Sequence, residues 1–124
     1  MIKRRPESGK RDRHAAGLLG ERLAALLLMV KGYRILARRL RTPAGELDIV
    51  ARRGRTLAFV EVKTRPDAVT ALHAVSPRQR ARIARAAGVY VARHPVYAGH
   101  DLRFDLIWVA PPGLPHHLPD AWRS

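Results

Sequence analysis

The chain has 124 residues, 47% of them hydrophobic, which is enough for one domain with a buried core. It has no cysteine, which excludes disulfides and thiolate metal sites and agrees with a reducing compartment. The 24 Lys plus Arg against 10 Asp plus Glu give a net charge of +14, and residues 15–110 carry 17 of the basic side chains. A basic folded body points to a polyanionic partner, with nucleic acid the commonest and an anionic membrane surface the alternative.

Residues 1–14 are expected to be a disordered basic arm, because they carry six basic side chains and no hydrophobic period. A helix is predicted from about Ala15 to Lys31, where Gly32 would end it. The eight apolar residues 23–30 look like the core of a signal peptide, but they are too few to cross a bilayer and no small-residue cleavage pattern follows. We therefore expect a cytoplasmic protein that does not enter the membrane.

Three strands are predicted after this helix, over about residues 33–41, 45–50 and 59–63. Residues 42–45 form a turn, so the three strands can pair as an antiparallel meander. In the second and third strands, carboxylates alternate with aliphatic side chains at a period of two, the pleat spacing of a strand. Three of the 10 acidic residues of the chain lie in these two short segments.

The loop between these two strands decides where their acids lie. A two-residue loop at Arg53-Gly54 would place glycine where a positive φ is needed. In that register Glu46 lies opposite Glu61, and residues directly opposite each other project to the same face. A three-residue loop would instead separate the acids. With the two-residue loop, one patch contains four charged side chains: Glu46, Asp48, Glu61 and Lys63.

A patch of this composition needs positive charge. Two carboxylates about 5 Å apart repel each other by roughly 3 kcal/mol at an effective dielectric constant of about 20. Lys63 can neutralise only one of the three acids. A divalent cation that prefers oxygen ligands, Mg²⁺ or Mn²⁺, is the simplest remedy. The alternative is a solvated strand face whose charges never meet.

A second helix is predicted from Ser76 to about Arg93, after a loop over residues 66–75. Ser76 is a suitable N-cap, Pro77 suits the first helical position, and Gln79 would complete a capping box. The arginines opposite the apolar stripe of this helix could bind a phosphate backbone, or they could form an ordinary solvated face. They are Arg78, Arg82, Arg85 and Arg93.

A last strand is predicted over residues 102–109, and the proline-rich residues 111–124 are expected to be an irregular tail. Asp105 lies in an otherwise apolar strand and is interpreted as a structural ion-pair partner. His116-His117 is too isolated in the tail to indicate a zinc site. Residues 15–110 therefore form the domain, in the order helix, three strands, helix, strand.

Five segments carry a resemblance to a known family: Gly20-Glu21 and residues 32–36, 45–50, 59–65 and 103–107. Over about residues 17–109 the chain resembles the YraN-like family of small, largely uncharacterised bacterial proteins. That family looks like a branch of the PD-(D/E)xK nuclease superfamily, with the restriction-endonuclease-like core also seen in archaeal Holliday-junction resolvases. The resemblance implies an α/β fold with a mixed sheet flanked by helices, and metal-dependent hydrolysis of phosphodiester bonds.

The resemblance also implies roles for individual residues. Asp48 would be the metal-binding aspartate, and Glu61 and Lys63 would be the (D/E)xK pair. Glu21 would match the first-helix glutamate of the resolvase branch, and Glu21 and Glu46 would be outer or second-metal ligands. Asp48, Glu61 and the main-chain carbonyl of the next residue would hold Mg²⁺ or Mn²⁺, and Lys63 would position a water molecule or neutralise charge.

The place of Glu21 in its helix supports this assignment independently. Leu18, Ala25 and Leu28 lie on the same helical face as Glu21. A carboxylate in an apolar stripe faces a desolvation cost of several kcal/mol unless it is paired. A metal ion or a basic residue would compensate for this cost. The alternative is a peripheral glutamate that pairs with an arginine.

Two positions depart from the pattern of the family. Arg39 stands where asparagine is expected after an arginine, and Arg78 stands where lysine is expected. Neither belongs to the metal set, but both could alter phosphate contacts, because lysine and arginine are not equivalent donors. For Gln79 the capping-box role is favoured over a contact with phosphate. The candidate nucleic-acid contacts are Arg65, Arg78, Gln79, Arg82 and Arg85.

Three functions stay open at this point. The first is a metal-dependent nuclease, with DNA favoured over RNA as the substrate. The resemblance to the resolvases, which act as dimers, leaves a homodimer open, although no segment of the sequence identifies a self-complementary surface. The second is a non-catalytic nucleic-acid-binding module on a nuclease scaffold, and the third is a basic adaptor for a protein or ribosomal partner. The clustered acids favour the nuclease, because without a metal ion such a patch would repel a phosphate backbone.

Overall fold

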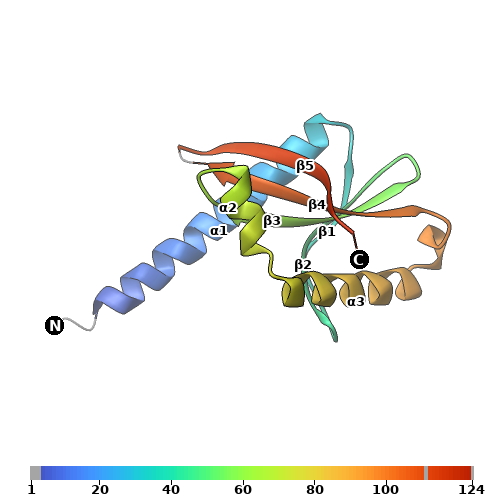
Figure 1. The fold of residues 1–124 in the computed structure, drawn as a ribbon, viewed down its shortest axis with the longest axis horizontal. Helices are drawn as coiled ribbons and strands as arrows, with labels where there is room; N and C mark the ends of the chain where they lie inside the picture. The colour runs from blue at the N-terminus through green and yellow to red at the C-terminus, as the bar shows by residue number, and fades with distance from the viewer. Residues whose placement is uncertain (1–3, 111, 124) are drawn as a thin grey trace.

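The computed structural model describes residues 4–110 and 112–123, with side chains from residue 17 onward (Figure 1). The helices are α1 (Arg4–Val30), α2 (Ala68–Ala74), α3 (Pro77–Arg93) and the short 3₁₀ helix η1 (Pro95–Tyr97). The strands are β1 (Arg34–Thr42), β2 (Gly45–Arg53), β3 (Thr56–Thr64), β4 (Asp101–Ala110) and β5 (Leu114–Trp122). Among the described residues, every helix is too short or too polar to pass through a bilayer.

All five strands belong to one sheet, in the order β1-β2-β3-β4-β5. β3 and β4 run parallel, whereas the other neighbouring strands are antiparallel. A parallel pair needs a crossover connection, which α2 and α3 supply. α1 packs on one face of the sheet, and α2 and α3 pack on the other (Figure 1). The fold is therefore α/β with a mixed sheet flanked by helices, consistent with a restriction-endonuclease-like core.

The C-terminus of α1 lies where the sequence predicts it. Gly32 has a φ of 90°, and its N–H donates to the carbonyl of Met29. The N–H of Tyr33 donates to the carbonyl of Leu28, which completes a Schellman motif. Leu28 and Tyr33 are both buried between α1 and the sheet. The end of the helix is thus fixed by a glycine and by a buried contact across it.

The N-terminus of α1 differs from the prediction. The helix begins at Arg4, so residues 4–14 are helical and the expectation of a disordered arm is wrong for them. Residues 1–3 lie outside the described residues. Arg, Lys, Glu and Ala are strong helix formers, and adding residues to an existing helix is much easier than nucleating one. A helix anchored by its buried C-terminal turns can therefore extend through a segment without hydrophobic period.

The predicted loop over residues 66–75 contains α2 instead. Asp67 is the N-cap of this helix, and its carboxylate accepts a 2.8 Å hydrogen bond from the N–H of Thr70. Ala71 is the residue of this helix that is buried. A helix of seven residues is too short to show a convincing hydrophobic period. The aspartate cap was the signal available in the sequence.

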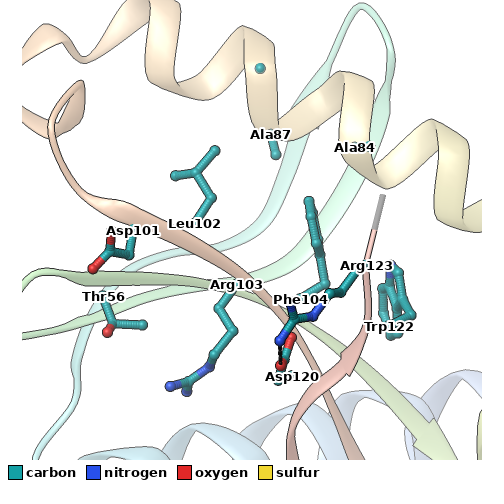
Figure 2. A pocket seen from close by; sticks show the side chains of 11 residues that line it. Thr56, Ala84, Ala87, Asp101, Leu102, Arg103, Phe104, Asp120, Trp122 and Arg123 are labelled. Carbon is teal, nitrogen blue, oxygen red and sulfur yellow. Dashed lines mark hydrogen bonds and ion pairs between the residues drawn. The ribbon is translucent and has the colours of Figure 1, made fainter.

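The predicted irregular tail over residues 111–124 contains β5. This strand lies at the edge of the sheet, where proline is tolerated because alternate N–H groups point away from the ladder. Pro115 accordingly pairs with Val109 of β4. Trp122 is buried beside Phe104, with ring centroids 6.0 Å apart (Figure 2). The end of the chain therefore closes the core.

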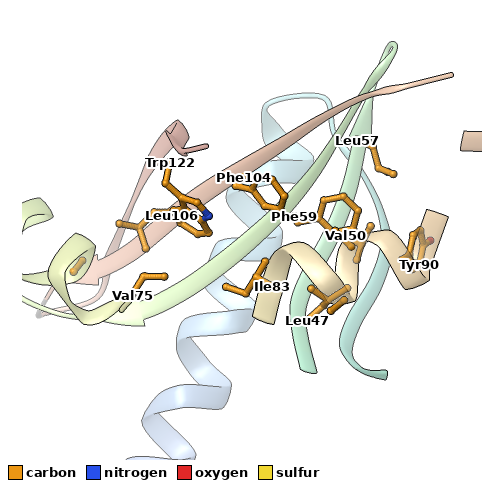
Figure 3. Packing of buried hydrophobic residues seen from close by; sticks show 13 residues of the cluster. Leu47, Val50, Leu57, Phe59, Val75, Ile83, Tyr90, Phe104, Leu106 and Trp122 are labelled. Atoms are coloured by element: carbon orange, nitrogen blue, oxygen red, sulfur yellow. The ribbon is translucent and has the colours of Figure 1, made fainter. Parts of the chain in front are cut away.

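The larger core cluster fills the space between the sheet and the helices α2 and α3 (Figure 3). Phe59 of β3 lies within it, and its ring centroid is 6.1 Å from that of Tyr90 and 6.0 Å from that of Phe104. Leu47 of β2 and Ile83 of α3 pack in the same cluster. This packing holds β2 and β3 against α3, and it thereby positions the charged residues where these strands end.

Asp105 lies on the other face of the sheet and is fully buried. It accepts hydrogen bonds from Arg103, His117 and the N–H of Asp120. Burial alone would raise the pKa of Asp105, but the hydrogen bonds from Arg103 and His117 outweigh it and lower the pKa to about 2. The predicted role of Asp105 as an ion-pair partner is confirmed, and His117 belongs to this network.

Asp105→Asn is expected to lower the free energy of unfolding by about 3 kcal/mol, because it leaves the Arg103 charge without its buried partner. Urea denaturation measures this change. Asp101→Asn, at an exposed position on the same strand, is the matched control and should change stability by less than about 0.5 kcal/mol. Equal stability of the two variants would contradict a structural role for Asp105.

Candidate active site

The hairpin of β2 and β3 carries most of the predicted acids. Arg53 pairs with Thr56, so the two-residue loop begins at Gly54, one residue later than predicted. Gly54 has a φ of 60° at the first loop position, where a type II′ turn uses glycine. The register therefore differs by two residues, and the predicted pairing of Glu46 with Glu61 is wrong. Because side chains repeat every two residues, a shift of two by itself keeps Asp48 and Glu61 on one face.

β2 and β3 separate at Asp48, and we call this place the β2–β3 fork. The last ladder pair is Ile49 with Val60, and the same register continued by one residue brings Asp48 level with Glu61. Asp48 Oδ2 accepts a 2.9 Å hydrogen bond from the N–H of Val62, beyond the end of the ladder. The carboxylate thus satisfies a backbone donor of β3 that the ladder no longer reaches.

β1 is irregular at the same level. The pairs on either side place Arg39 of β1 level with Asp48. Arg39 has a φ of 50°, a left-handed conformation that costs most residues other than glycine roughly 1–2 kcal/mol. Ile49 packs in the core under α1, whereas Leu47, two residues away, packs in the core under α3. The alternation of side chains therefore breaks at Asp48, which accounts for the fork.

A hollow of about 520 Å³ opens at the β2–β3 fork. Its walls include Glu21 of α1, Asp48 of β2 and residues 61–65. α1 approaches closely because Gly20 has no side chain, and a Cβ there would lie 3.3 Å from Thr64 Oγ1. Five of the predicted site residues therefore share this pocket: Glu21, Asp48, Glu61, Lys63 and Arg65.

Glu61 is buried in this pocket, with 8% of its side chain exposed. Its Oε1 accepts a 3.0 Å hydrogen bond from Gln79 Nε2 and lies 3.7 Å from Lys63 Nζ. Burial and the neighbouring Asp48 carboxylate raise the pKa of Glu61 to about 9, and the Lys63 charge offsets only part of the shift. The raised pKa favours the protonated form of the Glu61 carboxyl group at neutral pH.

Gln79 reaches Glu61 from the first turn of α3. Ser76 Oγ accepts a 3.1 Å hydrogen bond from the N–H of Gln79, which confirms the predicted N-cap. The side chain of Gln79 does not complete the capping box, because it donates to Glu61 instead. The start of α3 thus orients a carboxyl group of the pocket.

Glu21 closes the pocket from the side of α1. Its side chain is 14% exposed, and its buried Oε1 has no hydrogen-bond partner among the described residues. The Arg39 Nε atom lies 3.7 Å away, beyond hydrogen-bond distance. Burial and the charge of Asp48 raise the pKa of Glu21. A buried acceptor without a donor on the wall of a hollow indicates room for a bound ligand.

The oxygen atoms of the pocket fit a hard divalent cation. Mg²⁺ keeps several waters and commonly takes one or two protein carboxylates together with substrate phosphate. Asp48 and Glu61 supply two carboxyl groups, and Glu21 adds an acceptor without a partner. Among the side chains described, those of residues 17–110 and 112–123, no three His, Asp or Glu residues gather closely enough to enclose a metal ion. A cation in this pocket would therefore have only a few protein ligands.

The other predicted site residues lie outside the pocket. Glu46 is exposed, with Oε2 3.9 Å from Arg41 Nε. The side chain of Arg82 lies over Gly45, where a Cβ would come within 2.9 Å of Arg82 Cδ. This contact places α3 beside the turn between β1 and β2. The exposed arginines of α3 named as nucleic-acid contacts are Arg78, Arg82 and Arg85.

A second hollow of about 490 Å³ lies between α3, β4 and β5 (Figure 2). Two carboxylates, Asp101 and Asp120, line it. Asp120 Oδ2 lies 2.9 Å from Arg123 Nη2, so its charge is already balanced. Asp101 is exposed to solvent. Because this hollow has no buried acid pair among the residues described, the pocket at the β2–β3 fork is the stronger candidate.

On the sequence alone, Arg39 is outside the metal set but able to alter phosphate contacts, and the structure places its side chain beside Glu21. The family pattern held a signal for an unusual backbone conformation at position 39, because it expects asparagine there. Asparagine is one of the few residues other than glycine that adopt the left-handed conformation readily. The φ of 50° therefore gives a physical reason for that expectation.

The raised pKa of Glu61 predicts a free energy of unfolding that falls with pH. Protonated Glu61 favours the folded state fully below its ordinary pKa of 4.5, and this contribution is lost as the pH rises to about 9. Each unit of pKa shift corresponds to about 1.4 kcal/mol, so denaturant unfolding should show a loss of a few kcal/mol across this range. Glu61→Gln cannot ionise and should remove most of this slope. An unchanged slope in the variant would contradict the prediction.

Comparison with known proteins shows the family of this chain. Residues 20–109 match the model of the uncharacterised protein family UPF0102. The UPF0102 protein of Parvibaculum lavamentivorans is 55% identical over 86% of this chain and 80% of its own length. That of Methylorubrum extorquens is 51% identical over 94% of this chain and 91% of its own length, and that of Paramagnetospirillum magneticum is 51% identical over 86% of each. The chain therefore belongs to the UPF0102 family, which is the YraN-like family that its sequence resembles.

Proposed function

We propose that this protein is a Mg²⁺- or Mn²⁺-dependent nuclease that hydrolyses phosphodiester bonds in DNA. The observation that supports the proposal is the pair of carboxyl groups of Asp48 and Glu61, held with Lys63 in a hollow at the β2–β3 fork. Burying two acids together costs free energy. A proton on Glu61 lowers this cost, and a bound cation would lower it in place of the proton. Such an arrangement suits a site whose charge is completed by a bound metal ion.

Asp48 and Glu61 would hold the metal ion, with the main-chain carbonyl of Val62 as a further ligand and Glu21 near it. When bound, a divalent cation supplies Lewis-acid polarisation of the phosphate and an activated water. The remaining positions around Mg²⁺ are the ones that water and substrate phosphate usually occupy. Glu61 must lose its proton to become a ligand, so loading of the site depends on pH.

The side chains of the pocket have separate tasks in this proposal. Lys63 Nζ, 3.7 Å from Glu61, compensates the charge that develops on the phosphate oxygens during hydrolysis. Gln79 holds the Glu61 carboxyl group in one orientation through its 3.0 Å hydrogen bond. Arg65 lines the pocket just beyond β3 and is placed to contact a neighbouring phosphate. These residues orient the reacting groups and balance their charge.

The basic surface of α3 would bind the rest of the nucleic-acid strand. Its exposed arginines would not distinguish one nucleotide sequence from another, because the phosphate backbone is the same for every sequence. Arg82 joins this surface to the turn at Gly45, at the start of the strand that carries Asp48. A strand lying along α3 would therefore pass near the pocket. This geometry supports a nuclease that recognises the backbone or the shape of DNA.

Calorimetric titration of Mn²⁺ into the full-length protein tests the metal site. Wild type should bind about one ion, and Asp48→Ala should lose most of the affinity, because it removes a first ligand. At neutral pH, binding should release about one proton, the one held by Glu61, and Glu61→Gln should release none. Titrations in two buffers with different ionisation enthalpies measure this release.

Glu46→Gln is the matched control, because Glu46 is an exposed acid on the same strand as Asp48 and lies outside the pocket. It should bind Mn²⁺ as wild type does. Equal binding by wild type and Asp48→Ala, or no binding by either, would contradict a metal site at the β2–β3 fork. A loss of affinity in Glu46→Gln as large as that in Asp48→Ala would show that the ligands lie on the outer part of β2.

Cleavage assays test the reaction itself. Branched, single-stranded and duplex DNA are incubated with the protein in Mn²⁺ or in EDTA, and products are separated by electrophoresis. Cleavage is expected only with Mn²⁺ and should fall at least about 100-fold in Asp48→Ala, which removes a metal ligand, and in Lys63→Ala, which removes a positive charge beside the reacting phosphate. Metal-dependent binding of DNA without any cleavage would instead identify a non-catalytic module. Cleavage that persists in Asp48→Ala would point to a contaminating nuclease.

A further inference from the structure

We infer that Arg39 is a phosphate-binding residue of the pocket, held beside Glu21 until the backbone of a bound nucleic-acid strand takes the place of that carboxylate as its partner. The inference rests on the proposed function, because the phosphate belongs to a strand bound at the β2–β3 fork. It concerns a residue that lies outside the metal set and departs from the residue expected in the family.

The backbone at Arg39 is the first observation. Its φ of 50° is unfavourable for arginine, and Asp120 is the only other non-glycine residue with a positive φ in the described part of the chain. Arg39 is level with Asp48, where β2 leaves β3. Strained residues of this kind gather at functional sites, where the surrounding structure maintains them. The side chain of Arg39 lies beside Glu21, which lines the acidic pocket.

The side chain of Arg39 is the second observation. It is 42% exposed, and its Nε lies 3.7 Å from the buried Oε1 of Glu21. Within the part of the chain that the structure describes, the Arg39 guanidinium donates no hydrogen bond, although it has five N–H donors in a planar fork. That fork matches two oxygens of a phosphate group. The group is therefore placed at the site with its donors available.

A purely structural ion pair would look different, and the same protein provides an example. Arg103 donates to both oxygens of Asp105, with Nη2 2.7 Å from Oδ2 and Nε 2.8 Å from Oδ1. Arg39 approaches Glu21 only to 3.7 Å and leaves Oε1 without a hydrogen bond. The guanidinium thus lowers the electrostatic cost of Glu21 without being locked to it. An arginine held in this way can turn to a phosphate at little cost.

Equilibrium binding of DNA tests the inference. Fluorescence anisotropy of a fluorescein-labelled 20-base-pair duplex is measured with the full-length protein in Ca²⁺, which takes the place of Mg²⁺ without supporting rapid cleavage. Arg39→Asn removes the guanidinium and introduces a residue that tolerates the left-handed backbone. It should weaken binding about 10-fold or more, as expected for the loss of a charge-assisted hydrogen-bonded contact. Arg39→Lys keeps the charge but not the fork and should fall between Arg39→Asn and wild type.

Arg41→Asn is the matched control, because it removes the same charge from an arginine of the same strand whose side chain is 92% exposed. It should weaken binding by no more than about 3-fold, the effect of one distant charge on a polyanion. Thermal unfolding of Arg39→Asn should occur at or above the temperature of wild type, since asparagine relieves backbone strain. A larger loss of DNA affinity at position 39 than at position 41, with stability retained, supports the inference.

Three results would overturn it. Equal losses of affinity in Arg39→Asn and Arg41→Asn, accompanied by tighter Mn²⁺ binding in Arg39→Asn, would show that Arg39 only balances the charge of Glu21. A lower unfolding temperature for Arg39→Asn with DNA binding no weaker than in the control would show a structural ion pair. Absence of DNA binding by wild type would show that no nucleic-acid phosphate binds to Arg39. Absence of Mn²⁺-dependent cleavage, in contrast, would sink the proposed nuclease while leaving this binding comparison valid.

Discussion

The hydrogen bond from the N–H of Val62 to Asp48 Oδ2 joins β2 to β3 beyond the end of their ladder. A partly buried N–H without a partner is costly, so the carboxylate is held where the ladder fails. The same bond keeps Asp48 beside Glu61, and two acids in a poorly solvated space cannot both ionise at neutral pH without compensation. The raised pKa of Glu61 and its partial offset by the Lys63 charge both follow from this constraint.

Elements that are distant in the sequence maintain the pocket around this bond. Gly20 lets α1 approach the end of β3, which brings Glu21 to the pocket. Ser76 begins α3 at the position from which Gln79 reaches Glu61. The core around Phe59 then fixes α3 against β2 and β3 (Figure 3). Small residues and caps, which carry no chemistry, thus determine how precisely the acids are held.

The sequence predicts the outline of the site because strand periodicity survives errors of register. The predicted loop was one residue too early, yet Asp48 and Glu61 remain together, since a shift of two residues keeps each side chain on its face. The edge strand β5 was not predicted from the sequence, because its prolines indicated an irregular tail rather than a strand. At the edge of a sheet proline is tolerated, since not every N–H has to join the ladder. The left-handed backbone of Arg39 has no signature in the chain itself, because arginine gives no sign of a positive φ. Local patterns therefore locate the acids, and tertiary packing decides which neighbours they meet.

In the proposed nuclease, protons and metal ions would compete for the same carboxyl group at the β2–β3 fork. The pKa of Glu61, raised to about 9, favours its protonated form at neutral pH, so a divalent ion would have to displace that proton. This displacement would reduce the binding free energy of the ion, and the pocket would fill mainly when the ion is abundant or when substrate phosphate binds with it. A strand of DNA would bring those phosphate oxygens, and the net charge of +14 would attract the strand to the protein. Metal and substrate would then bind cooperatively, each lowering the electrostatic cost of the other, so a site that is weak for the ion alone can be strong for the pair.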